Sequence, residues 1–139
     1  MTADKSNIKL LDLKNKNLSS LPFDYFKDYV NLDTLILSNN EITELSWGIF
    51  SNNKKLRVID LSRNKIKHLD WNIFNNNPDL EIVILKDNMI KEISPYLFCN
   101  NPNIKKIFLD HNMLQTFPEN LFVYTVKLQI LNLGHNRLS

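Results

Sequence analysis

A period of 24 residues runs from residue 8 to the end of the chain and constrains the fold more than any other feature. Apolar aliphatic residues recur at this spacing in three columns, which begin at Ile8, Leu11 and Leu13, and no insertion or deletion interrupts the register. An asparagine column accompanies them at Asn40, Asn64, Asn88, Asn112 and Asn136. Such a period indicates a solenoid, in which each repeat packs only on its neighbours.

Each repeat alternates apolar and polar residues around its second and third apolar columns, as a strand with one buried face does. One such strand per repeat, stacked in parallel, predicts a sheet along a concave side. The chain must then turn away from the strand, which leaves backbone groups without sheet partners. An asparagine side chain carries a donor and an acceptor, so the asparagine column is predicted to satisfy those groups as a ladder. Aromatic residues are predicted to fill the core of the returning half: Phe26, Phe50, Phe74, Phe98 and Phe122.

These columns resemble the leucine-rich repeat pattern LxxLxLxxNxL over residues 8–139, and Leu21-Pro22 and Phe117-Pro118 begin LPxxxF motifs. The chain is similar to the 24-residue class of this family, and within it to extracellular invertebrate repeat proteins of the Toll and mosquito immune type. The resemblance implies an α/β solenoid shaped as a horseshoe, with a parallel sheet on the concave face. It implies irregular or short helical turns on the convex face.

The period divides the chain into a polar N-terminal segment and a repeat domain. The segment covers residues 1–7, and the repeats are expected at 8–31, 32–55, 56–79, 80–103, 104–127 and, in part, 128–139. Lys16 stands where the asparagine column would begin, so the ladder is predicted to start at Asn40. The last repeat ends directly after its strand at Ser139, which favours a fragment of a longer protein. Two uncapped ends also predict self-association.

Composition limits the function classes. Formal net charge is +2, which gives little reason to expect nucleic acid or an anionic membrane as a partner. No stretch approaches the roughly 18 apolar residues of a membrane span, so no membrane insertion is expected. The sequence holds no phosphate-binding loop, no metal-type spacing and no catalytic triad that the repeats would assemble. We therefore expect no enzyme activity, no catalytic residues, no cofactor and no metal.

An apolar patch is predicted on the concave face, where residues between the buried leucines point outward. It is centred on Ile84 and Phe108 and would serve as a protein-binding surface. The alternative is that β-branched residues stand there only because strands favour them. The patch residues are Ile36, Val58, Ile82, Ile84, Phe108 and Ile130.

Charged and polar residues are expected around the patch. The column that starts each strand alternates in sign from Lys9 to Lys105, which predicts cross-strand pairing more than ligand recognition. At the other end of the strands, four residues are expected on the ligand-binding face: Arg63, Asp87, Asp110 and His111. His111 and His135 would be neighbours, but two histidines without a third ligand are weak evidence for a metal or a pH switch.

Two further features bear on the biological role. Trp47 and Trp71 share a column with Phe23; covering the edge of the core is the favoured role for these rings, and a second contact surface is the alternative. Asn17 heads a glycosylation sequon that matters only if the chain is secreted. The sequence favours an extracellular recognition, immune or adhesion module that binds a protein. A cytoplasmic scaffold, and a structural or engineered repeat fragment without a ligand, remain the alternatives.

Overall fold

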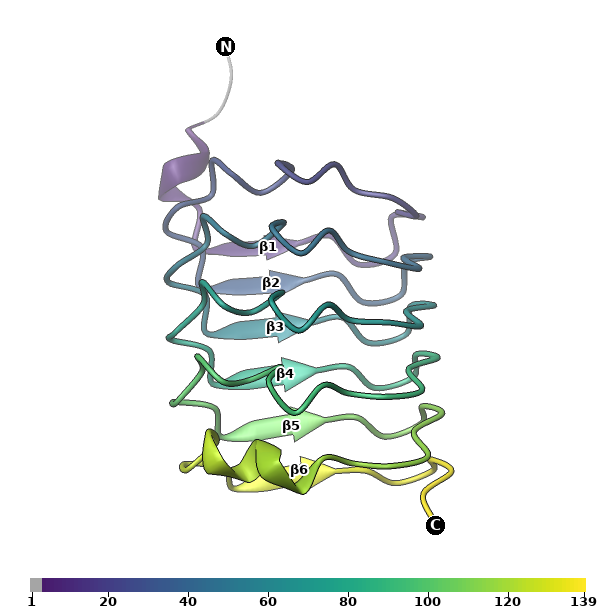
Figure 1. Ribbon diagram of the computed structural model, residues 1–139. Coiled ribbons are helices and arrows are strands. Elements are labelled where there is room, and N and C mark those ends of the chain that lie inside the picture. The colour runs from purple at the N-terminus through teal and green to yellow at the C-terminus, as the bar shows by residue number, and fades with distance from the viewer. Residues whose placement is uncertain (1–3) are drawn as a thin grey trace.

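The computed structural model describes residues 4–139 and shows one stack of similar turns, each with a three-residue strand (Figure 1). The strands form one six-stranded sheet in the order β1 to β6, and every pair is parallel. Their bounds are β1 Leu10–Asp12, β2 Thr34–Ile36, β3 Val58–Asp60, β4 Ile82–Ile84, β5 Lys106–Phe108 and β6 Ile130–Asn132.

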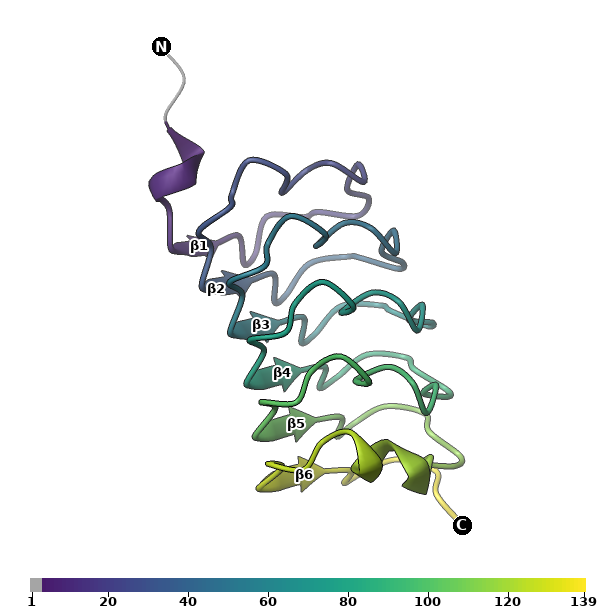
Figure 2. The same ribbon diagram turned by 60° about the vertical axis from the view of Figure 1, so that its left-hand side comes forward.

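The register of the sheet is the sequence period. Leu35 pairs with Ile59, and Ile59 pairs with Val83, so partners are always 24 residues apart. The sheet lines one side of the stack, and the returning segments form the other (Figure 2). The predicted solenoid with a parallel sheet and short helical turns is therefore confirmed.

The N-terminal polar segment is described from residue 4, and the remainder of its predicted range, residues 1–3, lies outside the described residues. It contains the 3-10 turn η1 Lys5–Asn7, capped by the Asp4 side chain, which accepts a hydrogen bond from the N–H of Ser6. The turn is tied to the first repeat, because the Asn31 side chain donates to the carbonyl of Ser6 at 2.7 Å.

The core lies between the sheet and the returning segments. The aliphatic columns are fully buried in the middle repeats, and Phe26, Phe50, Phe74 and Phe98 form a continuous ring stack with centroids 5.9 to 6.3 Å apart. The stacked rings bury large apolar surfaces in the returning half, together with aliphatic side chains such as Ile49, Ile73 and Leu97.

The prediction that Phe122 continues this stack is wrong. The fifth returning segment forms the 3-10 helix η2 Glu119–Val123, which follows Pro118. Its turn buries Leu121 and leaves Phe122 45% exposed. The rings of Phe122 and Phe117 lie with their centroids 5.9 Å apart. The tighter helical turn rotates the side chain away from the column that the other four phenylalanines share.

The asparagines after the strands join successive repeats. The Asn64 Nδ2 donates to the carbonyls of Leu37 and Leu61, both at 3.0 Å, while its Oδ1 accepts from the N–H of Ile42 at 3.1 Å. The series starts at Asn40, whose Oδ1 accepts from the N–H groups of Lys16 and Leu18, and it continues to Asn136. Each amide thereby serves as donor and acceptor to backbone groups that the strands leave unpaired.

A second asparagine column, on the returning side, was not anticipated from the sequence. Asn53, Asn77 and Asn101 are fully buried, and each Nδ2 donates to two carbonyls of the preceding repeat at 2.8 to 3.0 Å. Their 24-residue spacing was visible in the sequence and was the signal that could have revealed them.

Candidate ligand-binding face

Four apolar side chains form a contiguous cluster on the open face of the sheet. Val58 is the direct cross-strand partner of Ile82, and Ile84 is that of Phe108. All four are partly exposed, while the central residue of each of these strands is buried. We call this set, Val58, Ile82, Ile84 and Phe108, the concave cluster.

The other two residues of the predicted patch lie at its margin. Ile36 pairs with Asp60, which separates it from Ile84 in the same column. Ile130 is 43% exposed and pairs with Lys106, so it adjoins Phe108 only diagonally. The structure thus brings together four of the six residues in direct cross-strand pairs.

Ile84 and Phe108, like Ile36, occupy a position where the other three repeats carry a backbone-capping residue. Asp12, Asp60 and Asn132 each accept a hydrogen bond from the N–H two residues later, at 2.9 to 3.1 Å. An isoleucine or phenylalanine side chain has no acceptor. These two repeats therefore give up a local stabilising bond and present an apolar surface in its place.

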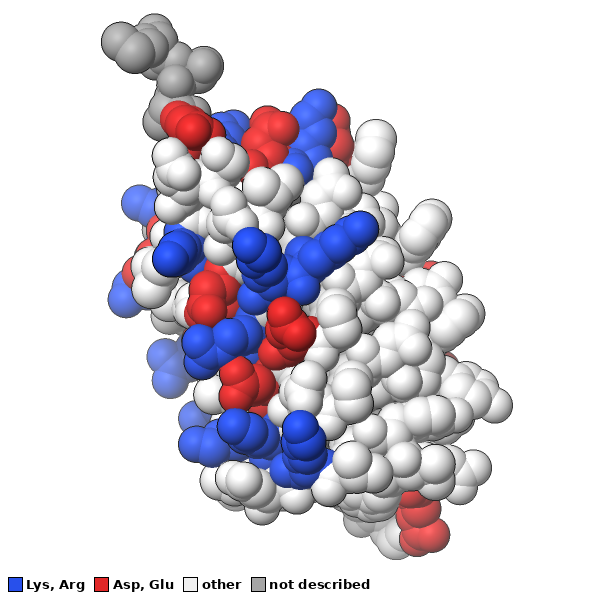
Figure 3. Space-filling model, turned by 90° about the vertical axis from the view of Figure 1, so that its left-hand side faces the viewer, with Lys and Arg blue, Asp and Glu red and all other residues white. Residues whose placement is uncertain are grey.

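An ion-pair network borders the cluster where the strands begin. Arg57 contacts Asp33 at 3.1 Å and Glu81 at 2.6 Å, and Lys105 contacts Glu81 at 3.0 Å. Figure 3 shows basic and acidic side chains next to one another along this side. The predicted cross-strand pairing is confirmed from Asp33 to Lys105, and no ion pair of Lys9 is found among residues 4–139.

This network shifts the ionisation of its central members. Hydrogen bonds from Lys105 and Arg57 lower the pKa of Glu81, and the hydrogen bond to Glu81 together with the nearby carboxylates raises the pKa of Arg57. Both shifts favour the charged forms. The charges satisfy one another, which leaves a weak field for steering a ligand.

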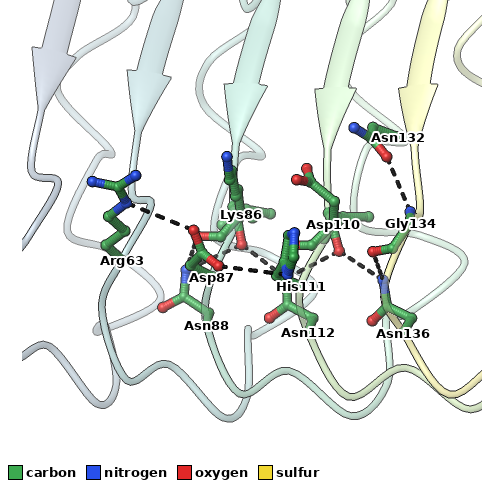
Figure 4. A network of polar contacts seen from close by, with 12 residues as sticks. Arg63, Lys86, Asp87, Asn88, Asp110, His111, Asn112, Asn132, Gly134 and Asn136 are labelled. Carbon is green, nitrogen blue, oxygen red and sulfur yellow. Dashed lines mark hydrogen bonds and ion pairs between the residues drawn. The ribbon is translucent and has the colours of Figure 1, made fainter.

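The turn after the strands holds three of the four predicted polar contact residues (Figure 4). Asp87 lies between Arg63 and His111, with Nε of Arg63 at 3.7 Å and Nδ1 of His111 at 4.0 Å from its carboxylate oxygens. Arg63, Asp87 and His111 all have φ of 56° to 57°, the left-handed region. His111 stacks on His135 with ring centroids 4.2 Å apart, as their shared column predicts.

Asp110 does not share the exposure of these neighbours. Its side chain is only 6% exposed, and its Oδ1 is buried without a hydrogen-bond partner among the described residues. It follows β5 by two residues, at a position in the turn that is buried rather than on the face. We correct the expectation that it offers a surface contact.

The tryptophan column is exposed at the surface of the returning side. Trp47 is 61% exposed and Trp71 is 47% exposed, and Phe23 and Tyr96 are exposed beside them. Tyr96 meets Trp71 edge-on with ring centroids 6.5 Å apart. Asn17, in the sequon, is also exposed and lies in a turn with φ of 56°.

Residues 4–139 present neither a metal-type cluster of side chains nor a membrane-spanning helix. No group of three or more histidine, cysteine, aspartate or glutamate side chains is arranged to hold a metal ion within that range. Among the same residues no helix has the length and apolar character needed to cross a bilayer.

Comparison with known proteins places these features in context. The sequence matches the model of the leucine rich repeat over residues 6–66, 30–90 and 78–138. No curated protein matches the chain significantly. The structure is similar to Toll in the glycosylated form of the Drosophila Toll–Spatzle complex, with 30% identity and a TM-score of 0.90 over 96% of this chain and 18% of that chain.

Two other solved structures are also similar. The leucine-rich repeat domain of APL1B shares the fold, with 23% identity and a TM-score of 0.86 over 94% of this chain and 38% of that chain. TLR13, solved in a complex with ssRNA13, shares 28% identity with a TM-score of 0.68 over 94% of this chain and 22% of that chain. The chain spans less than half the length of each of these proteins.

Proposed function

This chain belongs to the leucine-rich repeat family, and from that premise we propose that it is a non-enzymatic module that binds a protein ligand on the concave face of its sheet. The coarse assignment, a ligand-binding repeat solenoid, is supported by the likeness to Toll in its complex with Spatzle and to TLR13 in its complex with ssRNA13. The concave cluster supports the finer one.

The observation that carries the proposal is the exchange of capping residues for apolar ones at Ile84 and Phe108. Three repeats keep Asp or Asn at this position, so the fold accommodates the cap well. Local rules that a sequence breaks without a gain in stability mark functional positions. Exposed apolar clusters of this kind also mark interaction surfaces. Ile84 and Phe108 form the centre of the proposed contact.

The surroundings of the cluster favour a protein over a nucleic acid. A nucleic acid requires a concentrated positive field for its phosphates, and here Arg57 and Lys105 are held by Glu81 and Asp33. Protein interfaces combine an apolar centre with a polar rim. Arg63, Asp87 and His111 supply such a rim at one end of the strands.

We test this proposal with a substitution that the fold already tolerates. Phe108→Asn introduces the residue that Asn132 supplies in the next repeat, so folding is preserved while the apolar centre is lost. Proteins captured by the wild-type chain are identified, and each purified partner is titrated against both forms by surface plasmon resonance. Loss of a central aromatic contact weakens binding by about 2 kcal/mol, or roughly 30-fold.

Phe122→Asn is the matched control, because it removes an exposed phenylalanine on the returning side. A partner of the concave face retains its affinity for this variant. If every partner binds the Phe108→Asn and wild-type chains equally well, the concave cluster is not the binding surface.

We further propose an extracellular location. The Toll structure is of a glycosylated form, and the exposed Asn17 heads a sequon here. When the chain is expressed with a secretion signal in insect cells, the proposal predicts a glycan on Asn17. The glycan is detected as a mass decrease on glycosidase treatment, which is absent in Asn17→Gln. An unmodified Asn17 in the secreted protein contradicts this prediction.

A further inference from the structure

A second surface, separate from the concave cluster, runs along the solenoid beside the exposed tryptophans. Two adjoining hollows of about 460 Å³ and 310 Å³ lie there, and Trp47 lines one while Trp71 lines the other. His68 and Asp70 line both, so the two hollows are sections of one groove. We call it the tryptophan groove.

The groove is acidic. Glu44, Asp70 and Glu92 line it, one from each of three successive repeats, and no lysine or arginine is among its lining residues. None of the three carboxylates takes part in an ion pair among residues 4–139, whereas Glu81 contacts two cations. Asp70 accepts a hydrogen bond from the N–H of Asn72 at 2.9 Å, and this contact leaves its negative charge uncompensated.

Each hollow therefore combines a negative charge with an exposed indole ring. A guanidinium or ammonium group is stabilised both by a carboxylate and by the face of an aromatic ring, and tryptophan is the strongest of the aromatic partners. Arginine suits this combination better than lysine because its planar group stacks on the ring while its N–H groups reach the carboxylate.

The spacing of the repeats adds a geometric condition. In the buried phenylalanine stack of the returning side, rings of neighbouring repeats lie 5.9 to 6.3 Å apart, which gives the repeat-to-repeat distance in that part of the solenoid. An extended peptide rises about 3.3 Å per residue, so its alternate side chains are about 6.6 Å apart and point the same way. A peptide that lies along the groove would present every second side chain to a new repeat.

We propose that the tryptophan groove binds an extended basic peptide segment with arginines at alternate positions, pairing with Glu44, Asp70 and Glu92 and stacking on Trp47 and Trp71. The net charge of the whole chain is +2, so a basic peptide is not drawn to the surface at large. Charge complementarity is local to the groove. The proposal does not rest on the concave face and stands independently of it.

The test uses a synthetic peptide in which three arginines alternate with glycines. Trp47 and Trp71 are the two tryptophans of the chain, so tryptophan fluorescence reports on the groove alone. We expect a saturable change in fluorescence with a dissociation constant below about 1 mM at low salt, weakened by added salt because the contact is electrostatic.

Substitutions locate the site. Trp71→Ala and Asp70→Asn each weaken binding about tenfold, with Trp47 still reporting in the first variant. Phe108→Asn leaves the peptide affinity unchanged, and Trp71→Ala leaves the affinity of any concave-face partner unchanged, so failure of one proposal is distinguished from failure of the other. Both groove residues are at the surface, and thermal unfolding verifies that each variant is folded.

Three results would overturn the proposal. The first is that the arginine peptide does not bind at low salt. The second is that it binds with an affinity that Trp71→Ala and Asp70→Asn do not change. The third is that a neutral oligosaccharide binds at the tryptophans while the peptide does not, which would assign the exposed rings to carbohydrate recognition.

Discussion

Asparagines join neighbouring repeats on both sides of this solenoid, but the two columns use the amide group differently. After the strands, Asn88 donates to the carbonyls of Leu61 and Leu85 and accepts from the N–H of Ile66. On the returning side, Asn77 donates to the carbonyls of Phe50 and Asn53, while its Oδ1 is buried without a partner among residues 4–139.

This difference in the use of the amide oxygen indicates which column tolerates other residues. The amide of asparagine offers two N–H donors and a separate oxygen acceptor, and the column after the strands, which uses both, persists from Asn40 to Asn136. On the returning side only the donor is used. That column accordingly changes to Thr125 in the fifth repeat, where the hydroxyl donates to the carbonyl of Leu121 within its own repeat.

The largest expected effect comes from Asn88→Ala. The substitution removes one donor from each of two buried carbonyls, which keep their bonds from Asn64 and Asn112, and it leaves the buried N–H of Ile66 without its acceptor. The two lost hydrogen bonds and the unsatisfied N–H each cost about 1 kcal/mol, so the free energy of unfolding falls by about 3 kcal/mol. Urea unfolding followed by circular dichroism measures it. A loss below about 1 kcal/mol would contradict the larger contribution of this column to stability.

Asn77→Ala is the matched substitution on the returning side. Two carbonyls lose a donor, but the substitution also removes the buried Oδ1 that has no partner. The two effects oppose each other, and we expect a loss of about 1 to 2 kcal/mol in the free energy of unfolding. Urea unfolding of the two variants side by side tests this ranking. A loss for Asn77→Ala as large as that for Asn88→Ala would contradict it.

The smallest expected effect concerns the surface pairs that join the strand starts. The pKa of Glu81 is lowered in the folded protein below its ordinary value of 4.5, so its stabilisation is present above that value and is lost as pH falls through the lowered folded-state pKa. Glu81→Gln lowers the free energy of unfolding by less than about 1 kcal/mol at neutral pH, because exposed ion pairs contribute little to stability.

Unfolding measured at neutral pH and at pH about 3 checks the sign for Glu81. The difference in free energy of unfolding between wild type and Glu81→Gln is expected to shrink on acidification. A difference that stays constant with pH would mean that Glu81 does not contribute through its charge.

The period predicted much of the fold and part of the candidate site. It placed Val58 beside Ile82 and Ile84 beside Phe108, because partners in a sheet built of equal repeats must be one period apart. It also placed His111 beside His135. Asp110 was misjudged, because a residue just past a strand is exposed or buried according to the turn that follows.

The left-handed backbone conformation after the strands could not be predicted from the residue types at that position. Asn15 and Asn39 are residues that tolerate positive φ, yet Arg63 and His111 adopt the same conformation in their repeats. The stacked sheet and the asparagine ladder hold these turns alike, whatever side chain stands there. Such a constraint comes from neighbouring repeats and is absent from any single repeat.

The sequence by itself determined the repeat, the parallel register and the buried columns, because a strict 24-residue period with alternating apolar residues permits only one way of stacking. The tertiary structure decided the rest: the exposure of Trp47 and Trp71, the acidic groove beside them and the departure of Phe122 from the ring stack. These depend on how each returning segment turns against the next, and contacts between segments 24 residues apart set that geometry.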